Sequence, residues 1–590
     1  MYAINSGGVK LVRYLLALLF IFLVGCSEKD KVLTEKITLT QGDLYGYELN
    51  TVNVFEGIPY AKPPINDLRW RPPIKHNGWN KDLLAIEMPH SCMQPTEYGL
   101  NAFIGLWIEG SGMNWFSKKL IYLGAGLMPF LNGEANQSED CLYLNIVTPK
   151  IINQKLPVMM WIHGGGYRYG NGSGSYLNKD LVTNNVILVS INYRLGSMGY
   201  FAHPYLSAES KNNSSGNYGT LDQIHALKWI KDNIEAFGGD PDNITIFGES
   251  AGGHSVRQLM SSPLSKGLFH KAIAQSSYGI RNYINLKTSN GSVKSAEDAG
   301  RDFVKTLGIR EDENLLNNLR KISADNLIQV GSLSIGENVT SEDDWQISSY
   351  WMPVVDGWVF EDSDLNVSRY GKTHNVPLLI GFNSFEGSSL LPLFYTKEQN
   401  KNDSDWTSTI WNLAITDQYT KIPSEYIDWA KNIKLDKYLA SQKLWGDLNF
   451  GSSSYYSAIN HSKVNADTYF YYFNRAPASS KQIIGATHGA EIMYLFNSFI
   501  PGWPKNNIDD DIGKQMRLDW TNFAKTGDLS KFGWPRFSDQ QTMQMNYQTE
   551  MSYTKIYEEN LFKSMNNFYN NDFKPNGSID TPQLTNSDNR

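Results

Sequence analysis

A serine between two glycines is the residue in this chain best placed for nucleophilic chemistry. It is Ser250, in the run Gly248-Glu249-Ser250-Ala251-Gly252, which follows the β-branched stretch 244–247. A strand that turns directly into a helix through Gly-x-Ser-x-Gly holds the serine hydroxyl free above the end of a sheet. Glycines flank the turn because a Cβ there would collide with the neighbouring strand or helix. The pattern therefore predicts that Ser250 is a nucleophile.

A glycine run after an apolar stretch supplies a second part of such a site. Residues 156–162 read LPVMMWI and lead into His163-Gly164-Gly165-Gly166. Backbone N–H groups that no side chain covers can approach the oxygen of a tetrahedral intermediate closely. We expect the N–H groups of Gly165, Gly166 and Ala251 to form this oxyanion hole.

A serine nucleophile also needs a base and an acid that orients the base. Glu386 follows the apolar stretch 376–381, and His488 lies in a loop of small residues after the aromatic stretch 469–473. We assign Glu386 as the acid and His488 as the base. With an imidazole as the base, activity is expected to rise with pH through about 6 to 7.

The elements that must position these residues alternate between strands and helices, which indicates a mostly parallel sheet covered on both faces. Residues 219–236 carry apolar side chains at three- and four-residue spacing, so one face of this helix is expected to pack on the sheet. Two helical excursions, 293–332 and 397–446, are expected to form a cap over the site. The strand-like runs are 142–148, 158–162, 186–192, 244–247 and 378–382.

These segments together resemble the type B carboxylesterase and cholinesterase family, with landmarks in family order over roughly residues 35–560. The sequence EDCLYLN at 139–145 resembles the second signature of the family, and FEGIPYAKPP at 55–64 resembles its N-terminal motif. Further landmarks are Leu68-Arg69-Trp70, Asn192-Tyr193-Arg194, 216–230, 382–387, 485–496 and 520–530.

The resemblance implies an α/β-hydrolase fold, with a large, mostly parallel central sheet flanked by helices and with long helical cap insertions. It implies a triad in the order Ser250, Glu386, His488. The expected activity is that of a carboxylesterase, which hydrolyses a small-molecule carboxylic ester through an acyl-enzyme and needs no cofactor.

The resemblance to the cholinesterases does not extend to their choline site. In those enzymes a tryptophan ten residues before the second loop cysteine faces the quaternary ammonium, and here that position is Leu131, beside Phe130. Without the indole the cation–π contact is lost, which argues against choline esters. Glu249, which also occurs in the cholinesterases, is expected to place negative charge at the base of the pocket.

The resemblance also implies a disulfide. Cys92 and Cys141 lie where the family has its first disulfide, and they are the pair that remains once Cys26 is assigned to a lipid anchor. An exported protein enters an oxidising compartment, where such a bond forms. The alternative is two buried free thiols.

The N-terminal segment is typical of an export signal. Lys10 and Arg13 precede the apolar run 14–24, which is too short for an ordinary membrane span. The run ends in LVGCS at 23–27, which resembles a bacterial lipobox. We expect Cys26 to be lipidated and to anchor the protein to the bacterial cell envelope, with the outer membrane as one destination. The alternative is an ordinary secretory signal with a chance cysteine.

No composition shift divides the chain into several domains. The expected organisation is a lipoprotein signal peptide at 1–25, a tether at 26–34, one α/β-hydrolase domain at 35–565 and a polar, disordered tail at 566–590.

Charge and histidine spacing exclude two other classes of function. The formal net charge is −7 and the signs are mixed along the chain, which argues against a nucleic-acid partner. The ten histidines form no H-E-x-x-H motif or close cluster, so no metal site is assigned. The sequence does not indicate an oligomeric state.

Two other functions share the expected fold. A cell-surface lipase or polymer esterase would perform the same chemistry at an interface. A cholinesterase-like binding protein would perform none, but such proteins commonly lack an intact triad. The apolar segment 107–131 bears on the first alternative, because it forms either a buried helical piece of the cap or a lid with glycines at 124, 126 and 133 as hinges.

Overall fold

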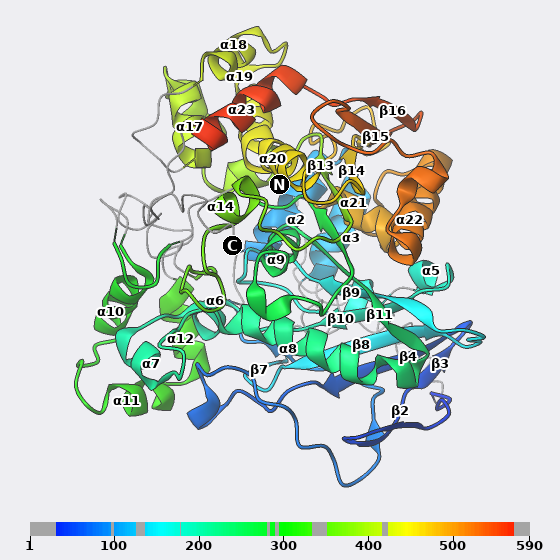
Figure 1. Ribbon diagram of the computed structural model, residues 1–590. Helices are drawn as coiled ribbons and strands as arrows, with labels where there is room; N and C mark the ends of the chain where they lie inside the picture. Colours follow the sequence, from blue (N-terminus) through cyan, green and yellow to red (C-terminus); the bar gives the residue numbers. More distant parts are fainter. Residues whose placement is uncertain are drawn as a thin grey trace, which may run out of the picture.

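A large sheet forms the centre of the molecule in the computed structural model (Figure 1), which describes residues 31–95, 99–125, 136–177, 179–279, 284–289, 294–332, 351–415 and 423–571. Within these residues the sheet has 11 strands. In spatial order they are β16 (Ser552–Lys555), β15 (Met543–Tyr547), β14 (Thr468–Phe473), β13 (Leu378–Asn383), β12 (Lys271–Gln275), β11 (Gly239–Glu249), β9 (Leu156–Ile162), β10 (Ile187–Ile191), β8 (Tyr143–Pro149), β4 (Val52–Pro59) and β3 (Tyr47–Leu49).

The middle of this sheet is parallel. Neighbouring strands from β15 through to β10 pair in parallel. Antiparallel strands flank them, with β16 at one side and β8, β4 and β3 at the other. The predicted α/β-hydrolase architecture, including the strands expected at 142–148, 158–162, 186–192, 244–247 and 378–382, is therefore confirmed.

The parallel strands are buried on both faces, which is why their sequences are continuously apolar. In β9 the side chains of Val158, Met160 and Ile162 belong to one core cluster, and those of Met159 and Trp161 belong to the other. The first face is covered by α8 (Tyr218–Asn233) and α9 (Ala251–Leu259). The second is covered by α22 (Asn507–Thr526) and α5 (Lys179–Val182).

The helix expected at 219–236 is α8 together with the 3₁₀ turn η3 (Ile234–Phe237). Leu221, Ile224 and Leu227 are buried in the core cluster on its side of the sheet, as their spacing predicts. Gly238, with φ of 83°, then ends the helical stretch in the left-handed conformation that glycine adopts without strain.

The two helical insertions occupy different places. The first contains α10 (Ala296–Thr306), α11 (Leu315–Lys321) and α12 (Ala324–Ser332), and it packs against α6 (Gly196–Tyr200) and α7 (Pro204–Glu209). The second contains α16 (Lys397–Asn402), α17 (Trp406–Ile415), α18 (Ser424–Asn432) and α19 (Lys437–Gly446). Because α19 packs against α15 (Gly387–Leu390), the second insertion adjoins the predicted acid Glu386. 

The domain extends beyond residue 565, where the sequence placed its end. Helix α23 (Glu559–Asn571) packs on α20 (Ser452–His461) and buries Phe568 and Tyr569, so the core includes residues on both sides of that boundary. At the other end Leu33 forms an antiparallel bridge with Tyr47. The predicted signal peptide, Cys26 and nearly all of the predicted tail lie outside the described residues.

The remaining elements are short or stand beside the site. None of the helices in the described part has the length and apolar character needed to cross a membrane. The short strands are those of the small sheet, β1 (Ile37–Leu39), β2 (Gly42–Tyr45) and β5 (Leu83–Leu84), and of the pair β6 (Ser91–Cys92) and β7 (Gln137–Ser138). The remaining helices are α2 (Gly99–Gly110), α3 (Trp115–Ala125), α14 (Asp364–Arg369) and α21 (Ala490–Leu495).

Candidate active site

Ser250 lies on a strained turn between β11, which ends at Glu249, and α9, which begins at Ala251. Its φ and ψ are 57° and −121°, a conformation that costs a non-glycine residue energy and is typical of functional turns. A Cβ on Gly252 would lie 2.0 Å from the carbonyl oxygen of Ile162, so the turn requires glycine there. The predicted nucleophile elbow thus has the expected local geometry.

The glycine loop lies against this elbow. A Cβ on Gly164 would lie only 3.1 Å from the Cβ of Ser250. Gly165 and Gly166 have φ of 99° and 63°. The N–H of Ala251 belongs to the first turn of α9, where backbone donors have no partner within the helix. The three residues expected to form the oxyanion hole therefore lie in two segments that meet at Ser250.

His163, at the start of the glycine loop, has a structural place. Its ring stacks on Tyr193 with centroids 4.5 Å apart, and its Nδ1 lies 2.9 Å from the carbonyl oxygen of Gly164. Burial lowers the pKa of the imidazole to about 4. His163 is therefore neutral near pH 7, and its ring holds the glycine loop in place by packing on Tyr193.

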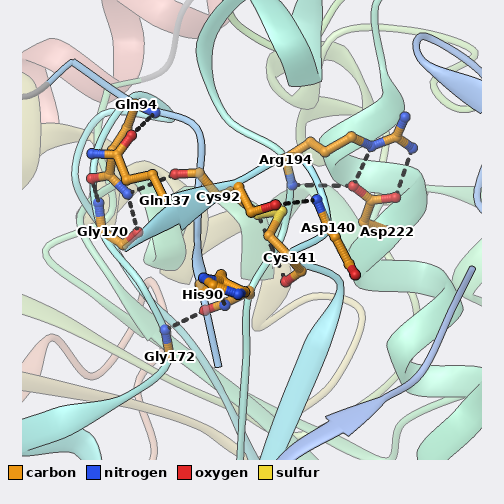
Figure 2. Close-up of a disulfide and its surroundings, with 12 residues drawn as sticks. His90, Cys92, Gln94, Gln137, Asp140, Cys141, Gly170, Gly172, Arg194 and Asp222 are labelled. Carbon is orange, nitrogen blue, oxygen red and sulfur yellow. Dashed lines mark hydrogen bonds and ion pairs between the residues drawn. A yellow bond between two sulfur atoms is a disulfide. The ribbon is translucent and has the colours of Figure 1, made fainter. Parts of the chain in front are cut away.

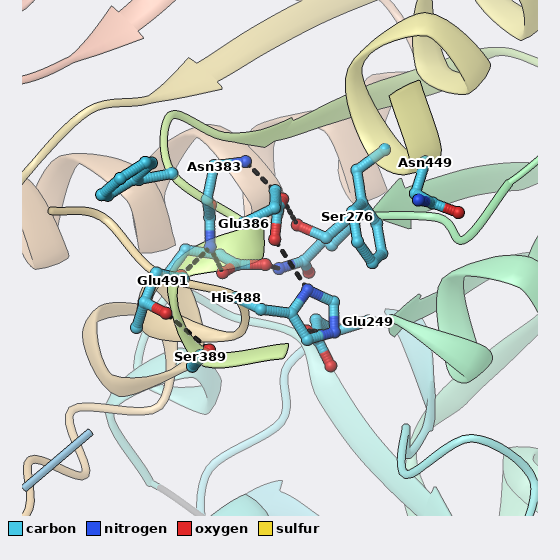
Figure 3. A network of polar contacts seen from close by, with 12 residues as sticks. Glu249, Ser276, Asn383, Glu386, Ser389, Asn449, His488 and Glu491 are labelled. Carbon is cyan, nitrogen blue, oxygen red and sulfur yellow. Dashed lines mark hydrogen bonds and ion pairs between the residues drawn. The ribbon is translucent and has the colours of Figure 1, made fainter. Parts of the chain in front are cut away.

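Glu386 and His488 form a buried hydrogen-bonded pair (Figure 3). Oε2 of Glu386 lies 2.7 Å from Nδ1 of His488. The other oxygen, Oε1, accepts a hydrogen bond of 2.7 Å from the Ser276 hydroxyl and one of 2.6 Å from the N–H of Asn383. The orientation of the imidazole is thus fixed by a carboxylate that is itself held in place.

These side chains follow neighbouring strands of the sheet. Ser250 follows β11, Ser276 follows β12, Glu386 follows β13, and His488 is in the loop after β14. The carboxyl ends of adjacent parallel strands lie at one edge of a sheet, where open α/β proteins build their sites.

The Nε2 atom of His488 faces a second carboxylate, 3.3 Å from Oε1 of Glu249. Ser250 is the next residue along the chain. No hydrogen bond of the Ser250 hydroxyl occurs within the described residues. The structure therefore brings the predicted acid and base into contact, and the predicted nucleophile directly follows Glu249, which His488 also contacts.

The two contacts of His488 change its acidity. Burial disfavours the charged ring, but the carboxylates of Glu249 and Glu386 outweigh burial and raise the pKa of His488 to about 9. Burial also raises the pKa of the Glu249 carboxyl to about 8. Groups in such close contact titrate as a pair. These contacts therefore predict a rise of activity at higher pH than the range of about 6 to 7 expected from an isolated imidazole.

A third buried acid, Glu491, was not recognised as part of the site from the sequence. Its Oε2 accepts a hydrogen bond from the side-chain amide of Asn383, and burial raises its pKa to about 7. Ser276 was also missed. Its only signal in the sequence is its position directly after an apolar strand, a position that many serines occupy.

The disulfide between Cys92 and Cys141 is present, as the resemblance implied, with Cα atoms 4.9 Å apart (Figure 2). Next to it, Gln94 donates a hydrogen bond of 2.9 Å to the carbonyl oxygen of Gly170 and accepts one of 2.9 Å from its N–H. The base of the disulfide loop is thereby attached to the segment that follows the oxyanion glycines.

The segment 107–131 divides into a buried and an exposed part. In α2 the ring of Phe103 lies 6.2 Å from that of His488, and Trp107 is buried with its ring 6.0 Å from that of Trp503. In α3, by contrast, Trp115 and Phe116 are 71% and 68% exposed. Residues 126–135, with two of the three candidate hinge glycines, lie outside the described residues.

A hollow of about 600 Å³ adjoins α3, lined by Glu109, Met113, Trp115, Lys118, Lys119 and Tyr122. It is open to solvent and does not include the predicted triad. Within the described residues no cluster of three or more potential metal ligands occurs.

Comparison with known proteins shows the family to which the chain is similar. The model of the "Carboxylesterase family" matches residues 33–567. Carboxylesterase 1E of Rattus norvegicus is 31% identical over 522 residues, 83% of this chain and 85% of the relative. Fumonisin B1 esterase of Sphingopyxis macrogoltabida is 30% identical over 504 residues, 82% of either chain. A carboxylesterase structure from Geobacillus stearothermophilus has a TM-score of 0.71 and 27% identity, and the alignment covers 90% of this chain and 100% of that one.

Proposed function

The chain belongs to the carboxylesterase family and is a carboxylic ester hydrolase, and from this premise we propose that Ser250, His488 and Glu386 carry the reaction. The observation that supports this most directly is the 2.7 Å contact between Glu386 and His488 beside the strained turn at Ser250.

In the proposed reaction the Ser250 hydroxyl attacks the ester carbonyl while Nε2 of His488 takes its proton. Glu386 holds the imidazole by Nδ1 and stabilises the imidazolium. The N–H groups of Gly165, Gly166 and Ala251 stabilise the oxyanion, at about 3 kcal/mol for a single donor in comparable sites. His488 then gives the proton to the leaving alcohol, and water repeats the sequence on the acyl-enzyme to release the acid.

Labelling with a fluorophosphonate tests the nucleophile. We expect wild-type protein to react at one serine and Ser250→Ala to remain unlabelled, with the modified peptide of the wild type containing residue 250. Ser255→Ala is the matched control, because Ser255 is buried five residues further along and bonds to Gln223 at 3.1 Å. Labelling that persists in Ser250→Ala would contradict the proposal.

Action at an interface is a second candidate function, and the exposed face of α3 favours it. Trp115, Phe116 and Leu120 are 71%, 68% and 50% exposed, and the ammonium of Lys119 lies 4.8 Å from the centroid of the Trp115 ring. Aromatic side chains next to lysines suit the boundary between water and an apolar phase. This surface would admit aggregated or long-chain esters.

Ester turnover below and above the solubility limit tests this candidate. We expect the double variant Trp115→Ser, Phe116→Ser to lose activity on aggregated p-nitrophenyl esters selectively, relative to short soluble esters. Ile151→Ser, at a site 77% exposed elsewhere on the surface, is the control for removal of an exposed apolar side chain. An equal effect on soluble and aggregated esters would exclude the interfacial function.

We also propose that Cys26 carries a lipid anchor. Leu33 is already part of the folded domain through its bridge to Tyr47, so the domain would lie within about 25 Å of the membrane. Metabolic labelling with palmitate should mark the wild type and fail to mark Cys26→Ser. Unlabelled, fully soluble wild-type protein would contradict the anchor.

A further inference from the structure

Arg168 lies in the chain two residues after Gly166, one of the glycines expected to bind the oxyanion. It lies in the turn that closes the glycine loop, where its N–H donates a hydrogen bond of 3.0 Å to the carbonyl oxygen of Gly165. The side chain is half-buried. Within the part of the chain that the structure describes, its guanidinium takes part in no ion pair or hydrogen bond.

The fully buried arginines of the described residues differ from Arg168 in this respect. Arg69 pairs with Glu139, Arg194 with Asp222 at 2.7 Å, and Arg257 with Asp364. This is the usual arrangement, because a charge removed from water is costly unless an opposite charge accompanies it. Burial accordingly lowers the pKa of Arg168 to about 10. The groups that raise this pKa are the phenols of Tyr169 and Tyr278, not carboxylates.

A short series of neighbours leads from Arg168 to the predicted base His488. Tyr278 is close enough to Arg168 to affect its charge. The ring of Tyr278 lies 5.9 Å from that of Phe450, and the ring of Phe450 lies 4.6 Å from the imidazole of His488. The backbone of Arg168 is only four residues from Gly164, which adjoins Ser250. The backbone contact with Gly165 and the rings of Tyr278 and Phe450 thus connect Arg168 to both sides of the predicted site.

We propose that Arg168 is a specificity-determining residue that binds a free carboxylate of the substrate, so that the preferred esters carry one negative charge. A guanidinium offers two parallel N–H donors that match the two oxygens of a carboxylate. The anion would supply the counter-ion that Arg168 lacks among the described residues. This inference rests on the proposed function, since it requires that the ester be cleaved at Ser250.

The carboxylate could belong to the acid or to the alcohol part of the ester, and two pairs of substrates separate these sources. Monoethyl adipate and diethyl adipate differ in a charge on the acid part. The 6-acetoxyhexanoate ion and 6-acetoxyhexanamide differ in a charge on the alcohol part. For each pair, kcat/KM is measured by pH-stat at pH 8 in wild type and in Arg168→Met, which removes the guanidinium and keeps an unbranched apolar side chain.

We expect Arg168→Met to lower the ratio of kcat/KM for the charged ester to that for the neutral one by about 10- to 100-fold in at least one pair, the range of a hydrogen bond to a charged group. Arg168→Lys should restore part of the ratio, because it keeps the charge but not the fork. Arg71→Met is the matched control, since Arg71 is 41% exposed and pairs with Glu209 at 2.6 Å on the surface.

Ratios within about twofold of wild type in both pairs, below the effect of a charged hydrogen bond, would overturn the inference and leave the proposed function intact. An equal loss of the charged-to-neutral ratio in Arg71→Met would also overturn the inference. A wild-type protein that hydrolyses none of the four esters would overturn the proposed function and the inference together.

Discussion

Nε2 of His488 lies 3.3 Å from Oε1 of Glu249, and Glu249 directly precedes Ser250 in the chain. The imidazole therefore lies between two carboxylates, Glu386 at Nδ1 and Glu249 at Nε2. In the proposed mechanism Glu386 orients the base, and both carboxylates raise the pKa of the imidazole.

The contact with Glu249 predicts an alkaline pH dependence. Since the two carboxylates raise the pKa of His488 to about 9, the free base and hence kcat/KM should increase through that range. Glu249→Gln removes a negative charge that favours the imidazolium, so the rise should move to lower pH by about one unit or more. The pH profile of kcat/KM measures this, with the exposed Glu235→Gln as control. An unchanged profile in Glu249→Gln would contradict the prediction.

Removal of the charge at Glu386 should be far more damaging. In Glu386→Gln the amide cannot stabilise the imidazolium and favours the wrong tautomer, so kcat should fall by about 10⁴-fold. Steady-state kinetics on a short soluble ester gives the size of the loss. Retention of near wild-type kcat would show that another residue orients His488.

Ser276 is expected to act through Glu386. Ser276→Ala removes the 2.7 Å hydrogen bond to Oε1 of Glu386 and should lower kcat by about 10-fold, with little change in KM. Ser262→Ala is the control, because it removes a hydroxyl that is equally buried and donates a 2.7 Å bond to the Val359 carbonyl far from the triad. A similar fall in kcat in both variants would mean that general destabilisation, and not the orientation of Glu386, is responsible.

The disulfide should contribute to stability through the unfolded chain. Cys92 and Cys141 are separated by 49 positions, and closing a loop of this size is worth about 4 kcal/mol in the chain-entropy account. The double variant Cys92→Ser, Cys141→Ser should therefore unfold at lower denaturant concentration, as followed by tryptophan fluorescence. Equal midpoints for the two proteins would contradict this.

Much of the fold and the site could be predicted because the signals are local. The strand before Ser250, the glycines around it and the apolar run before His163 are all contiguous in the sequence. The partners of Glu386, by contrast, are distant from it in the sequence. Ser276 and Glu386 are 110 residues apart, and no periodicity links them until β12 and β13 pair.

The segment 107–131 was ambiguous for a different reason. Its composition is apolar throughout, but burial depends on what covers each helix. Trp107 is 8% exposed and Trp503 packs on it, whereas Trp115, eight residues later in the next helix, is 71% exposed. The sequence also predicts the end of the domain at residue 565, because the residues that follow are polar on average. In the structure, however, Phe568 and Tyr569 of α23 are buried, and α23 packs on α20.

The placement of Ser250, Ser276, Glu386 and His488 after four adjacent strands has a consequence for how such a chain can diversify. Ser250, Ser276 and Glu386 lie within three residues of the ends of β11, β12 and β13, so their separation depends on the spacing of strands in the sheet, about 4.8 Å per step. His488 lies 15 residues beyond the end of β14, so its place also depends on that loop. The chain between Ser276 and β13 can therefore lengthen, shorten or be exchanged while Ser250, Ser276 and Glu386 keep their places. The loop residues around the substrate can thus change, in evolution or by design, while the side chains at the strand ends stay in place.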